Sequence, residues 1–174
     1  GTLYEVLDHA RQVPPAERHG RMFLEVIDRS LDRRGESAPV DSSTRARLAQ
    51  ADWPTAICWI GARLATALDY AHQRGVLHRD IKPANVMLAA DGTPKLVDFN
   101  VSFSATLDGV APAAYFGGSL AYMSPEQLDA CNSANKVQPE DLDHTCDIYS
   151  LGVMLWELLT TRRPFDDEAP QANW

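Results

Sequence analysis

The stretch VLHRDIKPANVML, residues 76–88, places a histidine, two basic side chains, a carboxylate and an amide directly before a short apolar run. A second apolar run follows after the turn sequence AADGTP, so the two runs predict a β-hairpin of Val86–Leu88 with Lys95–Val97. Asp98 comes directly after the second strand. Because the open ends of a hairpin lie side by side, the pattern predicts that Asn85 and Asp98 are brought together.

The polar side chains of this stretch suit the chemistry of phosphoryl transfer, in which catalysis consists mainly of positioning and electrostatic stabilisation. The carboxylate of Asp80 can orient an attacking hydroxyl, and Lys82 can neutralise phosphate charge. The amide oxygen of Asn85 and the carboxylate of Asp98 are suitable ligands for Mg²⁺. Each could singly be an ordinary polar loop residue, but together they favour a catalytic site.

Apolar residues at helical spacing predict helices before and after the hairpin. A short helix is expected over residues 2–7, and a longer one begins at Asp52, a suitable N-cap, and ends near Gly75. The segment 147–160 is apolar on nearly every side, so we expect a central helix there. A long loop rich in glycine and alanine is expected over residues 98–125.

Residues 8–52 are expected to form an insertion between the first two helices. One amphipathic helix is predicted within it by an apolar stripe of Met22, Phe23, Val26, Ile27 and Leu31. The sequence RRGESAPVDSS after this stripe predicts an exposed loop. We therefore expect residues 10–20 and 34–50 to be mobile and removable without loss of the fold.

Composition excludes several classes of protein. The net charge of −8 argues against a nucleic-acid surface, and the surplus of acids in the last third favours a solvated acidic face over a substrate-steering one. Cys58, Cys131 and Cys146 are far apart in the chain, which suggests neither disulfides nor a zinc site and favours the cytoplasm. No signal peptide opens the sequence, and the most apolar segment, residues 148–159, is too short to cross a bilayer, so no membrane contact is expected.

Four motifs resemble those of the protein kinases and occur in the order of that family. They are HRDIKPAN, similar to the catalytic loop; DFN, similar to the metal-binding DFG motif; GSLAYMSPE, similar to the end of the activation loop; and DIYSLGVMLWELLTTRRPF, similar to the central helix of the large lobe. The resemblance implies a protein-kinase-like α+β fold. Residues 1–174 would be a partial kinase domain, a mainly helical large lobe with a small β-hairpin at the catalytic loop. The small lobe is missing, because the sequence contains no glycine-rich loop, strand lysine or hinge.

The resemblance also assigns roles within the motifs. Asp80, Lys82 and Ser119 would be catalytic, and Lys82, Asn85 and Asp98 would bind the cofactors ATP and Mg²⁺, with Asn85 and Asp98 as the metal ligands. Met87 would lie under the adenine ring. Lys82, two residues after Asp80, and Ser119, where such kinases place a threonine, indicate the serine/threonine type, with a protein substrate.

Further roles implied by the resemblance concern the neighbours of the catalytic residues. His78 would pack beneath Phe99 and take no part in the chemistry, and Arg79 would receive an activation-loop phosphate. The candidates for that phosphate are Ser102, Ser104 and Thr106. Asn100 replaces the glycine of DFG, but asparagine tolerates positive φ better than most residues, so metal binding by Asp98 should survive.

The sequence thus predicts a serine/threonine-protein kinase, and its style resembles bacterial members of the family. The isolated chain is expected to be inactive, since the small lobe that clamps the phosphates is missing. The alternative is a pseudokinase or scaffold that keeps the fold and acts by binding partners. The intact residues Asp80, Asn85 and Asp98 favour the enzyme.

Overall fold

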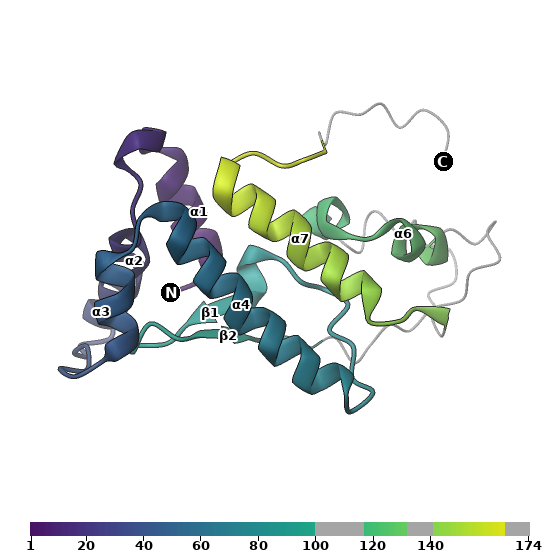
Figure 1. Ribbon diagram of the computed structural model, residues 1–174, viewed down its shortest axis with the longest axis horizontal. Coiled ribbons are helices and arrows are strands. Elements are labelled where there is room, and N and C mark those ends of the chain that lie inside the picture. The colour runs from purple at the N-terminus through teal and green to yellow at the C-terminus, as the bar shows by residue number, and fades with distance from the viewer. Residues whose placement is uncertain (100–116, 132–140, 166–174) are drawn as a thin grey trace.

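The computed structural model describes residues 1–99, 117–131 and 141–165, with residues 117–119 and 131 described by their backbone alone. The fold is mainly helical, with one two-stranded antiparallel sheet (Figure 1). In chain order the elements are α1 (Leu3–Arg11), η1 (Pro15–Glu17), α2 (Arg21–Asp32), α3 (Ser43–Gln50), α4 (Trp53–His72), η2 (Pro83–Asn85), β1 (Val86–Leu88), β2 (Pro94–Leu96), η3 (Gly117–Tyr122), α6 (Pro125–Cys131) and α7 (Thr145–Thr160).

Helices α4 and α7 form an antiparallel pair, and they lie side by side in Figure 1. At the start of α4, the indole Nε1 of Trp53 donates to the carbonyl of Leu158 near the end of α7 (3.0 Å). Between the two ends, the helices approach so closely that a Cβ added at Gly61 would lie 2.9 Å from Cδ1 of Leu155. A larger residue at position 61 would have to displace the Leu155 side chain.

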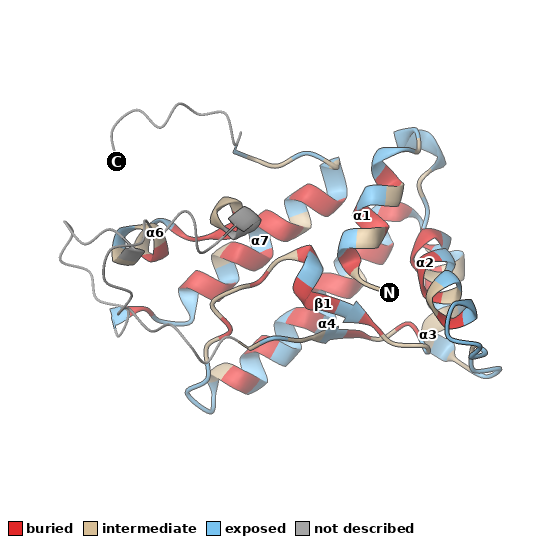
Figure 2. Ribbon diagram, turned by 180° about the vertical axis from the view of Figure 1, so that it is seen from behind, coloured by how far each residue is buried: buried red, intermediate tan, exposed pale blue. Residues whose placement is uncertain are grey.

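The predicted start of α4 is confirmed. Asp52 is its N-cap, and the carboxylate oxygen Oδ1 accepts a hydrogen bond from the backbone N–H of Thr55 (2.8 Å). The apolar stripe of the helix is buried from Ile57 to Leu68 and joins the core of the molecule. In Figure 2, buried and exposed residues alternate along α4, as expected of a helix that buries one side.

The predicted helix over residues 147–160 is present as α7, and among the described residues it is covered on one side only. Ile148, Trp156 and Leu159 are 50%, 53% and 40% exposed. Helix α4 and η3 pack against the other side, where Met154 and Leu158 are fully buried. An apolar surface shows what a helix can bury, but burial also needs a neighbour, and no described element covers these three side chains.

Helix α1 is longer than the sequence predicts, since it continues to Arg11 instead of ending at residue 7. Its start has a capping box, in which Thr2 Oγ1 accepts from the N–H of Glu5 (3.3 Å) and the Glu5 carboxylate accepts from the N–H of Thr2 (2.8 Å). The polar pair Asp8 and His9 suggests an end to the helix, but both lie away from the core while the next residue, Ala10, is buried.

The predicted amphipathic helix of the insertion is confirmed as α2, in which the five residues of the predicted apolar stripe are all buried. Residues 43–50 form the helix α3, so the expectation of a mobile segment over residues 34–50 is wrong for that part. Their removability stays a prediction. Ser42 caps this helix by accepting from the N–H of Arg45 (3.1 Å), and Leu48 is completely buried in the core. The sequence pattern missed α3 because only one of its large side chains is apolar. The preceding loop is exposed as predicted, and Val40 is 97% exposed.

The predicted hairpin is present, with its second strand one residue earlier than expected, at Pro94–Leu96 instead of Lys95–Val97. The register pairs Val86 with Leu96 and Leu88 with Pro94. The other edge of β1 contacts the start of the chain, where the N–H of Leu88 donates to the carbonyl of Gly1 (2.8 Å).

No helix in the described ranges is long and apolar enough to cross a lipid bilayer.

The burial of Leu48 makes a stability prediction for the full-length protein. Replacing Leu48 by alanine leaves a cavity between α3 and the core, so we expect the free energy of unfolding to fall by about 2–5 kcal/mol. Urea unfolding of wild type and Leu48→Ala measures this change. Val40→Ala, at an exposed position of the adjoining loop, should change it by less than about 0.5 kcal/mol. Equal midpoints for Leu48→Ala and wild type would show that burial of Leu48 does not stabilise the fold.

Candidate active site

The segment HRD, residues 78–80, is held by the buried carboxylate of Asp147 at the start of α7. Asp147 accepts the backbone N–H of His78 at Oδ2 (2.8 Å) and that of Arg79 at Oδ1 (2.7 Å). From the end of α4, Nε2 of His72 contacts the same Oδ2 (2.7 Å). Arg79 has φ = 65°, a left-handed conformation that is costly for a residue with a Cβ. Hydrogen bonds to a carboxylate are strong enough to offset that cost.

The segment SPEQ, residues 124–127, supports the same loop from the other side. Gln127 is completely buried, and its Nε2 donates to the carbonyl of Arg79 (3.0 Å). The Gln127 amide is oriented by Ser124, whose N–H donates to Gln127 Oε1 (3.1 Å) and whose Oγ accepts the N–H of Gln127 (3.3 Å). Both backbone polar groups of Arg79 are therefore paired with buried side chains.

His78 connects the catalytic loop to the end of the hairpin. The N–H of Asp80 donates to its Nδ1 (3.3 Å), and its Nε2 lies 3.1 Å from the carbonyl of Val97. One neutral tautomer, with the proton on Nε2, satisfies both contacts. Burial lowers the pKa of His78, which favours this neutral form. The ring lies 4.5 Å from that of Phe99 between centroids, so the predicted packing of His78 against Phe99 is confirmed.

Three of the predicted site residues, Asp80, Lys82 and Asn85, form one cluster. Oδ2 of Asp80 accepts from Nζ of Lys82 (2.8 Å) and from Nδ2 of Asn85 (2.8 Å). Nδ2 of Asn85 also donates to the backbone carbonyl of Asp80 (2.8 Å). The amino group of the Asn85 amide is thus turned toward Asp80. Asp80 and Lys82 remain partly accessible, with side chains 22% and 24% exposed.

The hairpin brings the two predicted metal ligands to the same end. The N–H of Val97 donates to the carbonyl of Asn85 (3.0 Å), and Asp98 is the next residue along the chain. Asp98 is exposed and has φ = 57°, whereas Asn85 is only 7% exposed. An amide oxygen and a carboxylate are ligands that Mg²⁺ prefers. The described residues contain no group of three or more His, Cys, Asp or Glu suited to a metal.

The remaining predicted site residues are described to different extents. Met87 lies on β1 between two buried neighbours and is 42% exposed, so its side chain is open to a ligand. Ser119 belongs to η3, where only its backbone is described. Asn100 and the three candidate phosphorylation sites, Ser102, Ser104 and Thr106, lie outside the described residues.

Sequence reasoning missed the two side chains that hold the catalytic loop, Asp147 and Gln127. Their contacts with Arg79 join residues 68 and 48 positions apart. The available signal was an acid near the start of a mainly apolar helix, since such a carboxylate has to find donors when it is buried.

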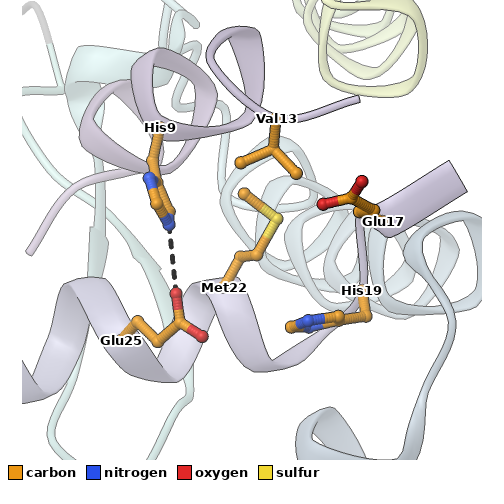
Figure 3. Close-up of a pocket in the computed structure, with 6 residues that line it drawn as sticks. All are labelled: His9, Val13, Glu17, His19, Met22 and Glu25. Atoms are coloured by element: carbon orange, nitrogen blue, oxygen red, sulfur yellow. Dashed lines mark hydrogen bonds and ion pairs between the residues drawn. The ribbon is translucent and has the colours of Figure 1, made fainter. Parts of the chain in front are cut away.

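A hollow of about 420 Å³ lies apart from this site, between α1 and α2. It is lined by His9, Val13, Glu17, His19, Met22 and Glu25 (Figure 3). Nε2 of His9 lies 3.0 Å from the carboxylate of Glu25, so these two side chains interact with each other across the helices. None of the lining residues belongs to the catalytic loop or the hairpin.

Comparison with families of known proteins identifies the fold, since the family model described as protein kinase domain matches residues 44–173. The chain belongs to the protein kinase domain family. Its mainly helical part with the two-stranded sheet is a partial large lobe of that domain, and the glycine-rich loop of the small lobe is not among the 174 residues.

The kinase domain has relatives among bacterial serine/threonine-protein kinases. It is 41% identical over 108 residues to a probable serine/threonine-protein kinase of Streptomyces coelicolor, a match that covers 61% of the chain and 15% of the relative. It is 35% identical over 138 residues to PknB of Mycolicibacterium smegmatis, covering 76% of the chain and 21% of the relative. PknB of Mycobacterium tuberculosis is 37% identical over 106 residues, with 60% and 16% covered. The chain therefore spans about a fifth or less of the curated relatives it matches.

The contacts of Asp147 predict a large effect of a small substitution. Asp147→Asn replaces one carboxylate oxygen by an NH2 group, so one backbone N–H of the catalytic loop loses its acceptor. We expect the free energy of unfolding of the full-length protein to fall by roughly 1.5–3 kcal/mol. Urea unfolding measures the loss, with the exposed Asp69→Asn on α4 as the matched control. An unchanged unfolding midpoint in Asp147→Asn would contradict the role given to this carboxylate.

The lowered pKa of His78 predicts a pH dependence of stability. Unfolding returns the imidazole to its ordinary pKa of 6.5, so below that value the unfolded state binds more protons than the folded state. Stability should therefore fall as the pH is lowered from about 7.5 to about 5.5. The fall should be smaller in His78→Gln, whose amide can still donate to the Val97 carbonyl but does not titrate. Urea unfolding at a series of pH values compares the two slopes, and equal slopes would rule out this contribution.

Proposed function

We propose that the protein carrying this chain is a serine/threonine-protein kinase that transfers the γ-phosphate of ATP to a hydroxyl of a protein substrate. The observation that supports this most directly is the cluster of Asp80, Lys82 and Asn85, in which both nitrogen donors meet one oxygen of Asp80. The cluster joins a catalytic base, a cation for phosphate and a metal-ligating amide in one partly accessible place. The relatives of the chain are named as serine/threonine-protein kinases.

In the proposed reaction, Asp80 orients the substrate hydroxyl and accepts its proton as the oxygen attacks the γ-phosphorus, while the bond from that phosphorus to the bridging oxygen breaks and ADP leaves. Oδ2 of Asp80 is engaged by Lys82 and Asn85, so the other oxygen, Oδ1, is the one that would face the hydroxyl. Lys82 stands beside that hydroxyl and would stabilise the negative charge of the transferring phosphoryl group. Asn85 and Asp98 would hold Mg²⁺, which neutralises charge on the phosphates when bound.

The finer assignments follow from the same proposal. Met87, exposed on β1, would contact the adenine ring of ATP, and Ser119 would bridge Asp80 and Lys82. Serine or threonine as the acceptor is supported by Lys82 and by the names of the relatives. The free thiols of Cys58 and Cys146 support a reducing, cytoplasmic environment for this part of the protein.

A scaffold without catalysis is the alternative, and the geometry does not favour it. A pseudokinase has no need for Asp80, Asn85 and the end of the hairpin to be arranged for transfer. The contacts among these residues support the enzyme. The isolated 174 residues should nevertheless be inactive, because positioning of the phosphates from the small lobe accounts for much of the rate. The test therefore uses the full-length protein.

Asp80→Asn separates the chemistry from nucleotide binding. The amide cannot accept the proton of the hydroxyl, so we expect the turnover number to fall by about 10²–10⁴-fold. ATP affinity should stay within about twofold, because the proposed metal ligands Asn85 and Asp98 are unchanged. Transfer of labelled phosphate and ATP titration measure the two quantities, with Asp69→Asn as the control. Wild-type turnover in Asp80→Asn would show that the loop is wrongly assigned.

A further inference from the structure

Helix α3 is attached to the turn of the catalytic hairpin by two side chains. Oγ of Ser42 donates to the carbonyl of Asp91 (2.7 Å), and Nη1 of Arg45 donates to the carbonyl of Ala90 (3.0 Å). These carbonyls lie in the turn between β1 and β2, at the end of the hairpin opposite to Asn85. Both contacts join parts of the chain more than 40 residues apart, so they are products of the fold and not of local turn chemistry.

Arg45 is itself fixed by α2. Its Nη2 contacts both carboxylate oxygens of Asp28, at 2.7 and 2.9 Å. The Arg45 side chain is only 15% exposed, which strengthens the ion pair relative to a fully solvated one. A planar guanidinium paired in this way has little freedom to turn, so Asp28, Ser42 and Arg45 form a rigid support for the hairpin turn, which we call the brace.

Packing at Gly92 shows how closely α3 is seated on the turn. A Cβ added there would lie 3.1 Å from side-chain atoms of both Leu48 and Thr44. Gly92 also has φ = 91°, which residues with a Cβ rarely adopt. The turn therefore needs a glycine for its own conformation, and a Cβ added there would press against side chains of α3.

We propose that Arg45 is a positioning residue for magnesium binding, acting through the hairpin on Asn85 and Asp98. This inference rests on the proposed kinase function, since it assumes that these two residues hold the metal. Each strand has three residues, so the hairpin is only about 10 Å long, and such a ribbon is marginally stable without support. Support at the turn fixes the direction of the ribbon, and with it the position of its open end.

The open end is where small displacements matter most. The hydrogen bond from the N–H of Val97 to the carbonyl of Asn85 ties the two strands together directly beside Asp98. Mg²⁺ requires nearly ideal octahedral geometry, so a tilt of the ribbon that moves its ligands weakens binding. The brace belongs to residues 8–52, and this part of the chain would thus support catalysis without containing any residue that touches the substrate.

The test compares Arg45→Ala, Arg45→Lys and Arg47→Ala in the full-length protein. Arg47 is the matched control, because it is an exposed arginine on the same helix. Fluorescent ATP analogue binding is titrated at a series of Mg²⁺ concentrations, and exchange of the Val97 amide is followed by hydrogen–deuterium exchange. For Arg45→Ala we expect roughly tenfold more Mg²⁺ for half-maximal binding, as for other groups that orient metal ligands. Binding of the analogue without Mg²⁺ should not change, and Val97 should exchange faster.

Arg45→Lys keeps the charge and one donor, so its Mg²⁺ requirement should lie between those of wild type and Arg45→Ala. If Arg45→Ala does not fold, Arg45→Lys tests the role of Arg45 instead. A Mg²⁺ requirement and Val97 exchange equal to those of Arg47→Ala would overturn the proposal. So would equal loss of analogue binding with and without Mg²⁺, which indicates general destabilisation. Phosphate transfer by the wild type is measured separately. Its absence refutes the proposed function, whereas the Mg²⁺ titration and Val97 exchange test the brace without requiring turnover.

Discussion

The contacts of the Asp147 carboxylate hold the loop that carries the candidate active site. This carboxylate is completely buried, and it gathers the backbone of His78 and Arg79 with the imidazole of His72. A buried charge without donors would be costly, so the folded state is stable only when the loop presents its N–H groups. The same contacts keep Arg79 in its left-handed conformation. This backbone conformation determines where the next residue, Asp80, is placed.

The position of Asp147 depends on how α4 and α7 pack. The close crossing at Gly61 and the bond from Trp53 to the end of α7 fix the helices against each other over their length. Their antiparallel arrangement brings the end of α4, with His72, to the start of α7, with Asp147. The catalytic loop begins just after α4, so the chain leaves this helix close to the Asp147 carboxylate.

Sequence reasoning succeeded where the signal is local. The hairpin, the cap of α4 and the cluster of Asp80, Lys82 and Asn85 each lie within a short stretch of chain, and their spacing is sufficient to predict them. The contacts of Asp147 and Arg45 join residues far apart, and no pattern within one window reports them. Helix α3 was missed for a related reason, since a single buried leucine gives no periodicity.

Helix α7 carries a second buried carboxylate, Glu157, ten positions after Asp147 and therefore about 15 Å along the axis. Asp147 lies at the N-terminal end, where the helix dipole favours an anion, but Glu157 lies near the C-terminal end, where it does not. Arg11 of α1 and Arg163 supply the compensating positive charge, at 2.7 and 3.4 Å.

Tyr122 completes the surroundings of Glu157, since its hydroxyl donates a hydrogen bond to the carboxylate (2.5 Å). Burial and this contact raise the pKa of Tyr122, so the hydroxyl remains a donor. One helix therefore binds the catalytic loop at its first turn and α1 and η3 at its last turn. Because α1 also begins beside β1, the two ends of α7 restrain the site from opposite sides, through the loop that bears Asp80 and through the helix that flanks the hairpin.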